Sequence, residues 1–327
     1  MKIRPIRTLI TAAIVGCVSG AEPIDIGSRR ELFVDRLLID ELKGVALKLH
    51  TPQLAPPIDS PRPHGHYATF IRDGDRFRFY YRGEKVPDLH WRTGWEEYQL
   101  NQVTMCAEST DGIHWTLPNY GIYRHPAFPE GNVVLADDFL VNSTFTPFID
   151  TRPGVPPDAR FKAVGGQSYQ KQFAQIREKF GPGGLKAYAS PDGIHWRRMQ
   201  EAAVIPEAWG TFDSQNLAFW SETEGMYVCY FRVFENALRS IARTTSQDFL
   251  KWTDPVRMKP NAPGEHLYTN GTQPYFRAPH IYIATAARFF KGRPGLTEEE
   301  ARQARRGIRE HAAHGVEGVR VAGDGNG

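Results

Sequence analysis

Alternating apolar and polar positions recur along the chain and predict β-hairpins. The clearest run spans residues 70–82 and turns at Asp73-Gly74; a second run spans 217–232 and turns at a Glu-Gly pair. An apolar strand, an acidic-Gly turn and an aromatic strand together form a hairpin signal. No heptad pattern survives the spacing of Pro and Gly, which excludes a coiled coil. The pattern therefore predicts an all-β fold.

A second repeat follows the hairpins. The run at 105–115 is echoed at 187–196 and, more weakly, at 242–252. Each copy reads as a strand that ends in Ser or Thr, then a tight turn with Asp, then Trp. The Asp side chain can cap such a turn, and Gly accepts a positive φ there. We expect each Trp to pack between neighbouring sheets, where it buries a large apolar area.

A hairpin followed by a strand, a turn and Trp gives about one four-stranded blade, the repeating unit of a β-propeller. The predicted fold class is therefore an all-β propeller. The expected blades fall at 66–121, 142–204 and 212–257, with a fourth that opens at Asn270 and runs to 290.

Composition and charge narrow the class of protein. The chain has 327 residues, 12% of them aromatic, which excludes intrinsic disorder. The formal charge is +3, and Lys2, Arg4 and Arg7 lie at the start. Without these three, the 40 basic residues fall to 37, equal to the 37 acidic ones. A neutral surface gives no electrostatic reason to bind nucleic acid or an anionic membrane.

The N-terminus reads as a targeting segment. The basic residues precede an apolar stretch at 9–18 and the small residues of 19–21, the form of a secretory signal. This stretch is too short to span a bilayer as a mature helix. Residues 14–17 also resemble a lipoprotein cleavage box ending in Cys17, so lipid anchoring stays open. We expect a secreted or periplasmic protein, in which Cys106 and Cys229 are buried free thiols rather than a disulfide.

At this point the sequence resembles a known family. The run Ser-x-Asp-Gly-Ile-His-Trp at 109–115 and 190–196, with Arg-Phe-Tyr-Tyr-Arg-Gly at 78–83, is similar to the five-bladed β-propeller glycoside hydrolases. That superfamily includes β-fructosidases, arabinanases and xylosidases. The opening at 30–40 is similar to a secreted bacterial branch of it, and the resemblance covers about residues 22 to 303. Six-bladed sialidase-like propellers use a related turn.

Fewer blades are visible than the resemblance implies. Residues 291–327 contain no Phe, Trp, Tyr or Cys, although Thr297 and Glu300 form a capping-box pattern that predicts a short helix. Our hypothesis is an incomplete propeller whose reading frame is lost shortly after Ala304; a genuine polar tail is the alternative. The expected domains are a signal peptide at 1–21, an N-terminal arm at 22–62, a propeller at 63–290, and a helix with a disordered tail at 291–327.

Polar and aromatic residues stand at the expected starts of the innermost strands. In a propeller these positions line a central funnel, where rings can stack on sugars and amides can bond hydroxyl groups. The alternative is that polar residues only mark the passage from loop to strand. The predicted substrate-binding residues are His64, His66, Arg82, Arg232, Gln215, Asn216, Tyr268 and Asn270.

Glycoside hydrolysis usually needs two carboxylates. The sequence predicts Asp213 and Glu235 as an acid/base pair beside Arg232. Glu84 follows a matching Tyr-Tyr-Arg run, but we interpret it as a solvated hairpin end. The relatives' three-carboxylate set cannot be carried over, since His66 stands at the first position, so binding of carbohydrate without catalysis is the alternative.

Other cofactor and metal signals are weak. His64-x-His66 has no third ligand dictated by the sequence, so no metal is expected. No phosphate-binding loop or dinucleotide fingerprint occurs, so no cofactor is expected either.

Overall fold

The computed structural model describes residues 24–53, 67–86, 95–136, 138–168, 174–292, 297–300 and 302–303. The chain divides into two compact units, Met1–Gln53 and Leu54–Gly327. The predicted leader at 1–21, with Cys17, lies outside the described residues, as does the predicted arm-to-propeller boundary.

The first unit forms turns, and residues 24–53 contain no strand or helix. The Asp25 carboxylate accepts a hydrogen bond from the Gly27 backbone N–H at 2.8 Å, and Asp35 does the same for Leu37 at 2.8 Å. Such contacts are the Asx turns that short acidic side chains favour. The Leu49 side chain is exposed.

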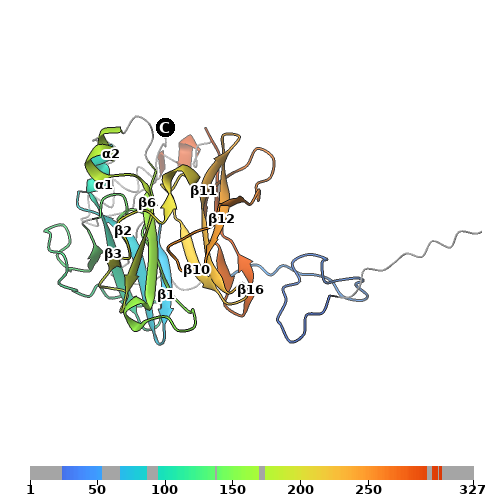
Figure 1. Cartoon of the computed structure of the whole chain (residues 1–327). Coiled ribbons are helices and arrows are strands. Elements are labelled where there is room, and N and C mark those ends of the chain that lie inside the picture. The colour runs from blue at the N-terminus through green and yellow to red at the C-terminus, as the bar shows by residue number, and fades with distance from the viewer. Residues whose placement is uncertain are drawn as a thin grey trace, which may run out of the picture. The chain divides into compact units, whose positions relative to one another are not determined.

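The second unit is built mainly of antiparallel sheets (Figure 1). Its first sheet runs in chain order through β1 (Thr69–Asp73), β2 (Arg76–Glu84), β3 (Gln102–Ser109) and β4 (Val133–Leu135). The short helix α1 (Trp95–Leu100) precedes β3. Gly74 adopts φ +65° between β1 and β2, so the predicted Asp-Gly hairpin is confirmed.

Two further sheets repeat this pattern. The second contains β5 (Thr146–Ile149), β6 (Phe161–Gln167), β7 (Gly184–Ser190) and β8 (Arg197–Arg198), with β9 (Ile205–Pro206) beside β7. The third contains β10 (Leu217–Ser221), β11 (Met226–Glu235), β12 (Leu238–Ser246) and β13 (Val256–Arg257). Short helical segments connect some strands: η2 (Pro157–Ala159), α2 (Ala174–Phe180) and η4 (Glu207–Trp209). A four-stranded meander is the topology of a propeller blade.

The chain after the third sheet forms two smaller sheets. Strand β14 (His266–Asn270) pairs with β17 (Ala286–Phe289), and β15 (Gln273–Tyr275) pairs with β16 (Ala278–Ile283). The sequence placed the opening of this region at Asn270, but β14 begins four residues earlier and ends there. The all-β class with several antiparallel sheets is confirmed; the number of blades and closure of a ring stay predictions.

The predicted capping box at the C-terminal segment is confirmed. The Glu300 backbone N–H donates to the Thr297 hydroxyl at 3.2 Å, and the Thr297 backbone N–H donates to the Glu300 carboxylate at 2.7 Å. These two reciprocal bonds satisfy amide groups that a helix start leaves without partners. The Thr297 backbone N–H and the Thr297 hydroxyl both donate to the Glu300 carboxylate, and these two bonds lower the pKa of Glu300.

The repeated turn has the same hydrogen bonds in all three copies. In the first copy the Gly112 N–H donates to the Ser109 hydroxyl at 2.8 Å. The Asp111 carboxylate accepts from the backbone N–H groups of Ile113 and His114, both at 2.8 Å. The Trp115 ring N–H then closes the turn on the Gly112 carbonyl at 3.2 Å. The copies that end at 196 and 252 repeat these contacts. Phe249 takes the glycine position of the third copy, with φ +70°.

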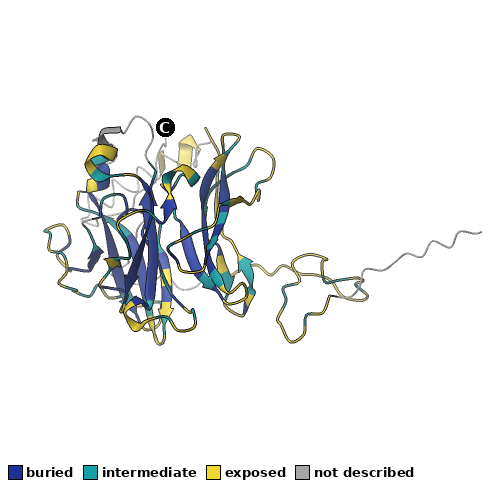
Figure 2. Cartoon of the chain, in the orientation of Figure 1, coloured by how far each residue is buried: buried dark blue, intermediate teal, exposed yellow. Residues whose placement is uncertain are grey.

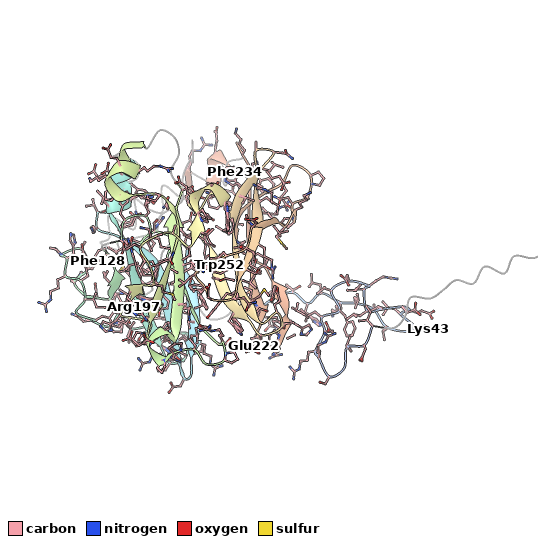
Figure 3. All side chains as sticks on the ribbon, viewed as in Figure 1. Lys43, Phe128, Arg197, Glu222, Phe234 and Trp252 are labelled. Atoms are coloured by element: carbon pink, nitrogen blue, oxygen red, sulfur yellow. The ribbon has the colours of Figure 1, made fainter. Side chains whose placement is uncertain are left out.

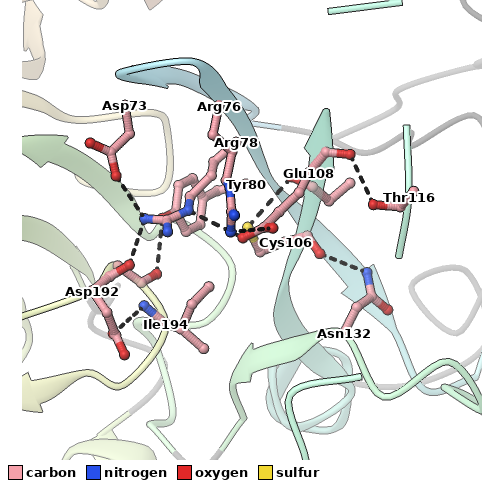
Figure 4. Close-up of polar contacts among 12 residues, drawn as sticks. Asp73, Arg76, Arg78, Tyr80, Cys106, Glu108, Thr116, Asn132, Asp192 and Ile194 are labelled. Atoms are coloured by element: carbon pink, nitrogen blue, oxygen red, sulfur yellow. Dashed lines mark hydrogen bonds and ion pairs between the residues drawn. The ribbon is translucent and has the colours of Figure 1, made fainter. Parts of the chain in front are cut away.

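The turn of the second sheet docks on the first sheet (Figure 4). The Arg78 guanidinium donates to the Asp192 carbonyl at 2.5 Å, and the Tyr80 hydroxyl donates to the Gly193 carbonyl at 2.9 Å. The rings of Tyr80 and Trp196 lie 6.4 Å apart, edge to face. The prediction that a blade-end Trp packs between sheets is therefore confirmed for Trp196.

The strands carry most of the buried side chains, and the connecting loops are largely exposed (Figure 2). One apolar cluster joins the second sheet to the third, with Leu185 on one side and Phe231 on the other. Nearby, the buried Asp150 carboxylate forms an ion pair with Lys162 and accepts a hydrogen bond from the Tyr227 hydroxyl at 2.7 Å.

Both cysteines in the described chain are buried free thiols, as predicted. Burial raises the pKa of Cys106 to about 12 and raises that of Cys229 as well, so both thiols stay protonated at neutral pH. No helix among the described residues has the length and apolar content to cross a membrane.

Candidate functional site

Residues near the starts of different sheets lie in contact here, although they are far apart in the sequence. The Tyr67 hydroxyl, just before β1, donates to the backbone carbonyl of Asp213, just before β10, at 3.1 Å. The neighbouring Ser214 hydroxyl donates to the backbone carbonyl of Tyr268 in β14 at 3.2 Å. These contacts bring the first, third and fourth sheet regions to one place.

Three arginines and two tyrosines form the centre of this place. Arg82 lies over the Tyr67 ring, with its guanidinium carbon 5.5 Å from the ring centroid. Arg232 and Arg239 lie over the Tyr268 ring at 5.6 and 5.4 Å. We call these five residues (Tyr67, Arg82, Arg232, Arg239 and Tyr268) the arginine–tyrosine cluster.

The cluster is tightly held at Tyr67. This residue adopts φ +53°, a left-handed conformation that costs an ordinary residue about 1–2 kcal/mol. Burial and the neighbouring Tyr268 raise the Tyr67 pKa well above its ordinary value, although Arg82 and Arg232 partly oppose this. The Tyr67 hydroxyl is therefore a proton donor at neutral pH, which fits its bond to a carbonyl.

Asp213 lies at the water-exposed edge of the cluster. Its carboxylate forms an ion pair with the Arg232 guanidinium. The Arg232 side chain is 5% exposed, whereas the Asp213 side chain is 49% exposed. A buried guanidinium thus holds an accessible carboxylate by a charge-assisted bond. Burial, reinforced by the charge of Arg239, lowers the Arg232 pKa.

An exposed aromatic ring lies beside this ion pair. Arg232 lies over the Phe234 ring at 5.7 Å, and Phe234 is 43% exposed. Figure 3 places Phe234 at one end of the third sheet and Glu222 at the opposite end. The cluster therefore marks one defined end of that sheet.

The two glutamates at the hairpin ends are placed differently. Successive strand residues point to opposite faces. Glu84 is two residues from Arg82 in β2 and shares its face, whereas Glu235 is three residues from Arg232 in β11 and lies on the other face. The pKa of Tyr98 in α1 depends on both Arg82 and Glu84. Burial raises this pKa, the charge of Arg82 lowers it and the charge of Glu84 raises it. Strand alternation thus puts Glu84 on the cluster side of its hairpin and Glu235 on the opposite side.

Three of the predicted substrate-binding amides bond the protein itself. The Gln215 amide donates to the Ala68 carbonyl at 2.9 Å and so ties two strand starts together. The Asn216 amide donates to two backbone carbonyls of the preceding loop, at 3.0 and 2.8 Å. The Asn270 carbonyl oxygen accepts from the hydroxyl of Thr272 at 2.9 Å. These bonds support the loop-to-strand interpretation for the three amides.

The remaining predicted residues divide into two groups. Arg82, Arg232, Tyr268 and Asp213 come together in and beside the cluster. His64 and His66 lie outside the described residues. Within the residues that the structure describes, no three His, Cys, Asp or Glu side chains gather in a way that could hold a metal ion.

The predicted binding residues leave out four residues of this site: Tyr67, which belongs to the expected strand start at 64–67, and Tyr98, Phe234 and Arg239. Phe234 pairs with Arg239 across the β11–β12 hairpin. That register follows from a two-residue turn at 236–237, whose residues have φ +50° and +62°. Phe234 could have been predicted because strand residues two positions apart share a face with Arg232. Arg239 could then have been predicted because a two-residue turn at 236–237 places it opposite Phe234. No sequence signal pointed from Tyr98 to this site.

Comparison with known proteins gave structural matches only. No family model matches the sequence, and no curated protein sequence matches it. The chain is similar to solved glycoside hydrolases. An endo-arabinase from Bacteroides thetaiotaomicron matches at 12% identity over 73% of this chain and 75% of that one, with a TM-score of 0.43. Zg3597, a family 117 glycoside hydrolase from Zobellia galactanivorans, matches at 13% over 69% and 62%, with a TM-score of 0.41.

A β-fructofuranosidase from Bombyx mori also matches, at 13% identity over 68% of this chain and 47% of that one, with a TM-score of 0.40. Scores of this size assign neither a blade number nor an activity to this chain.

Proposed function

We propose that this chain is a carbohydrate-active protein of the glycoside hydrolase type, in which a saccharide binds at the arginine–tyrosine cluster and Asp213 is the catalytic carboxylate. The observation that carries the proposal is the ion pair of an exposed Asp213 carboxylate with the buried Arg232. Tyrosine rings can stack on sugar faces, and guanidinium groups can donate to hydroxyl groups.

The chemistry follows from the charge of Asp213. Glycoside hydrolysis passes through an oxocarbenium-like transition state, which a carboxylate stabilises as a nucleophile or electrostatically. A neighbouring guanidinium favours the ionised form of a carboxyl group. Asp213 therefore suits the anionic role better than the role of proton donor. The proton donor would be a second carboxyl group, for which the sequence proposes Glu235 and strand alternation favours Glu84.

A second candidate function is carbohydrate binding without hydrolysis. The observation in its favour is that Glu235, the predicted partner of Asp213, lies on the strand face opposite Arg232. A site with one reacting carboxylate binds sugar through the same rings and arginines but lacks the proton transfer that cleavage needs.

The remaining expectations are proposals of the same kind. We propose a propeller from the repeat of sheet, turn and Trp, and a five-bladed one because the sequence resembles the five-bladed glycoside hydrolases. The N-terminal pattern of basic, apolar and small residues leads us to propose action outside the cytoplasm, with a lipid anchor at Cys17 as the alternative.

The test is an activity screen of the chain from Glu22 on aryl glycosides and on plant and algal oligosaccharides. We expect turnover of at least one substrate, and a loss of about 10²–10⁴-fold in kcat for Asp213→Asn. Circular dichroism would verify folding. Asp158→Asn is the matched control, because Asp158 is also an exposed aspartate paired with an arginine, Arg197.

Each outcome has a stated meaning. Turnover that survives Asp213→Asn contradicts the catalytic role. A folded chain that binds an oligosaccharide but releases no product supports the second candidate. A folded chain that neither binds nor cleaves any of them contradicts both.

A further inference from the structure

The arginine–tyrosine cluster carries more positive charge than its own carboxylates balance. It holds three guanidinium groups, and Asp213 forms an ion pair with one of them, Arg232. Within the described residues, neither Arg82 nor Arg239 forms an ion pair with a carboxylate; both lie over aromatic rings instead. Cation–π contact stabilises a guanidinium but leaves its N–H donors available for another acceptor.

Several other buried or half-buried arginines of this protein form ion pairs with carboxylates. Four arginines at the contacts between and within sheets each bond a carboxylate: Arg78, Arg160, Arg198 and Arg243. Buried or half-buried charges are usually paired in this way, because an unpaired one loses its hydration without compensation. Within the described residues Arg82 and Arg239 lack such a carboxylate, as does Arg152, which lies over the Tyr227 ring at 5.6 Å.

Two donors of the cluster also have no hydrogen-bond partner among the residues that the structure describes. The Nε atoms of Arg232 and Arg239 are buried and form no hydrogen bond. Arg232 is 4% exposed, and its guanidinium reaches the accessible Asp213. Arg239 is half-buried, with its guanidinium carbon 4.3 Å from the Phe289 ring centroid. Leaving a buried donor unpaired costs free energy, so the hydrogen bonds of these two guanidinium groups are incomplete within the described residues.

We propose that the arginine–tyrosine cluster selects an acidic saccharide, one whose sugar rings carry carboxylate or sulfate groups. This inference rests on the proposed carbohydrate function and names its substrate class. The anionic group accepts from Arg239 and Arg82, for which the planar guanidinium fork is well suited. The sugar ring lies against the exposed aromatic edge at Phe234, and Asp213 stays paired with Arg232.

The charges of the site fit this ligand. The site contains three arginines and two carboxylates, Asp213 at the cluster and Glu84 on the same strand face as Arg82. This leaves one positive charge in excess. An anionic group on the sugar neutralises that excess. A neutral sugar would leave it in place and would use only the rings and hydroxyl bonds.

The experiment measures binding of the full mature chain to immobilised polysaccharides in matched pairs. Polygalacturonate and alginate are each compared with their carboxyl-reduced neutral form, and a sulfated galactan is compared with its desulfated form. We expect at least one acidic member to bind at least tenfold more tightly than its neutral partner. We also expect this preference to weaken as NaCl rises from 50 to 300 mM. The carboxylate and sulfate arms show which anionic group is recognised.

Three variants connect the preference to the cluster. Arg239→Gln and Arg82→Gln should each weaken acidic binding about tenfold, and Arg239→Lys should retain part of it because the charge remains. Arg72→Gln is the matched control, because Arg72 also lies over an aromatic ring, Phe77 at 5.7 Å, on the exposed side of β1. Thermal melts verify that each variant is folded.

The failures of the two proposals are distinguishable. Binding or cleavage of neutral saccharides alone, with dependence on Asp213, overturns the acidic preference and leaves the carbohydrate function standing. Acidic binding that Arg239→Gln, Arg239→Lys and Arg82→Gln all leave unchanged also overturns it. No binding to any polysaccharide overturns both.

Discussion

The hairpins β1–β2 and β10–β11 share one sequence pattern, but the distance from arginine to glutamate in it differs by one residue. Both end in two aromatic residues followed by arginine, and a glutamate comes shortly after. In β2 the glutamate is two residues after Arg82, at Glu84; in β11 it is three residues after Arg232, at Glu235. Because strand side chains alternate, one extra residue moves the carboxylate to the other face.

The difference changes what each hairpin contributes to the site. In β11 the position two residues after Arg232 is Phe234, so an aromatic ring stands where β2 has the carboxylate of Glu84. The register across the turn then places Arg239 opposite Phe234. The first sheet therefore supplies an arginine with a carboxylate, and the third supplies two arginines with a ring.

The strongest test of this comparison is a pair of isosteric substitutions. If Glu84 is the second carboxyl group of a hydrolase, Glu84→Gln should lower kcat by about 10²–10⁴-fold. Glu235→Gln should change kcat less than about threefold, because its side chain lies on the opposite face. Rates on the best substrate of the activity screen check this. The reverse ranking would restore the acid/base pair that the sequence proposes and contradict the alternation.

The blade-end turns offer a comparison in stability. Phe249 is fully buried at the turn of the third sheet, where the first sheet has Gly112. Phe249→Ala should lower the free energy of unfolding by about 3–5 kcal/mol, because it leaves a cavity. Gly112→Ala should cost only about 1–2 kcal/mol, since it strains a φ of +77° in open space. Urea unfolding measures both; equal losses would contradict this ranking.

A third change copies the spacing of the first hairpin into the third sheet. Phe234→Glu places a carboxylate two residues after Arg232, beside Arg239. The added negative charge should weaken binding of an acidic saccharide about tenfold, roughly the 1.4 kcal/mol that one tenfold step represents. Phe234→Gln is the control for loss of the ring. If the two variants bind equally well, charge at this position does not govern binding.

The smallest expected effect is the pH dependence of the turn aspartates. Burial raises the pKa of Asp192, but hydrogen bonds from His195 and Ile194 outweigh it and hold the pKa below its ordinary range. A lowered carboxyl pKa gives stability that is fully present above the ordinary value of about 3.9 and is lost as the pH falls below it.

The measurement is the melting temperature of the wild type and of Asp192→Asn between pH 2 and 7. The variant should be less stable by about 1 kcal/mol at pH 7, a small value because the side chain is partly exposed. The two melting curves should converge as the pH falls below about 4. A constant difference over the whole range would show that ionisation of Asp192 contributes nothing.

Local patterns predicted much of the fold. The hairpin at Asp73-Gly74, the repeated Asp turn and the capping box at Thr297 each depend on residues a few positions apart, so the sequence alone could show them. The blade-end Trp was correctly predicted to lie between sheets at Trp196. The number of blades and ring closure depend on contacts between distant segments, which no local pattern encodes.

The candidate site was only partly predictable for the same reason. Polar strand starts led to Asp213 and Tyr268, and the repeated aromatic-aromatic-Arg pattern led to Arg232. The Gln215 amide, however, bonds the Ala68 backbone carbonyl, and the Asn270 side-chain oxygen accepts from the Thr272 hydroxyl. The hydrogen bond between Tyr67 and the Asp213 carbonyl joins residues 146 positions apart. Nothing in a single sequence indicates such a pairing.

The most direct test of the central claim is a crystal structure of the Asp213→Asn variant with the best-bound oligosaccharide of the binding panel. The account predicts a sugar ring against Phe234 or the tyrosines of the cluster, with its anionic group within hydrogen-bond distance of Arg239 or Arg82. A sugar bound elsewhere, such as at the Glu222 end of the third sheet, with the cluster empty, would contradict it.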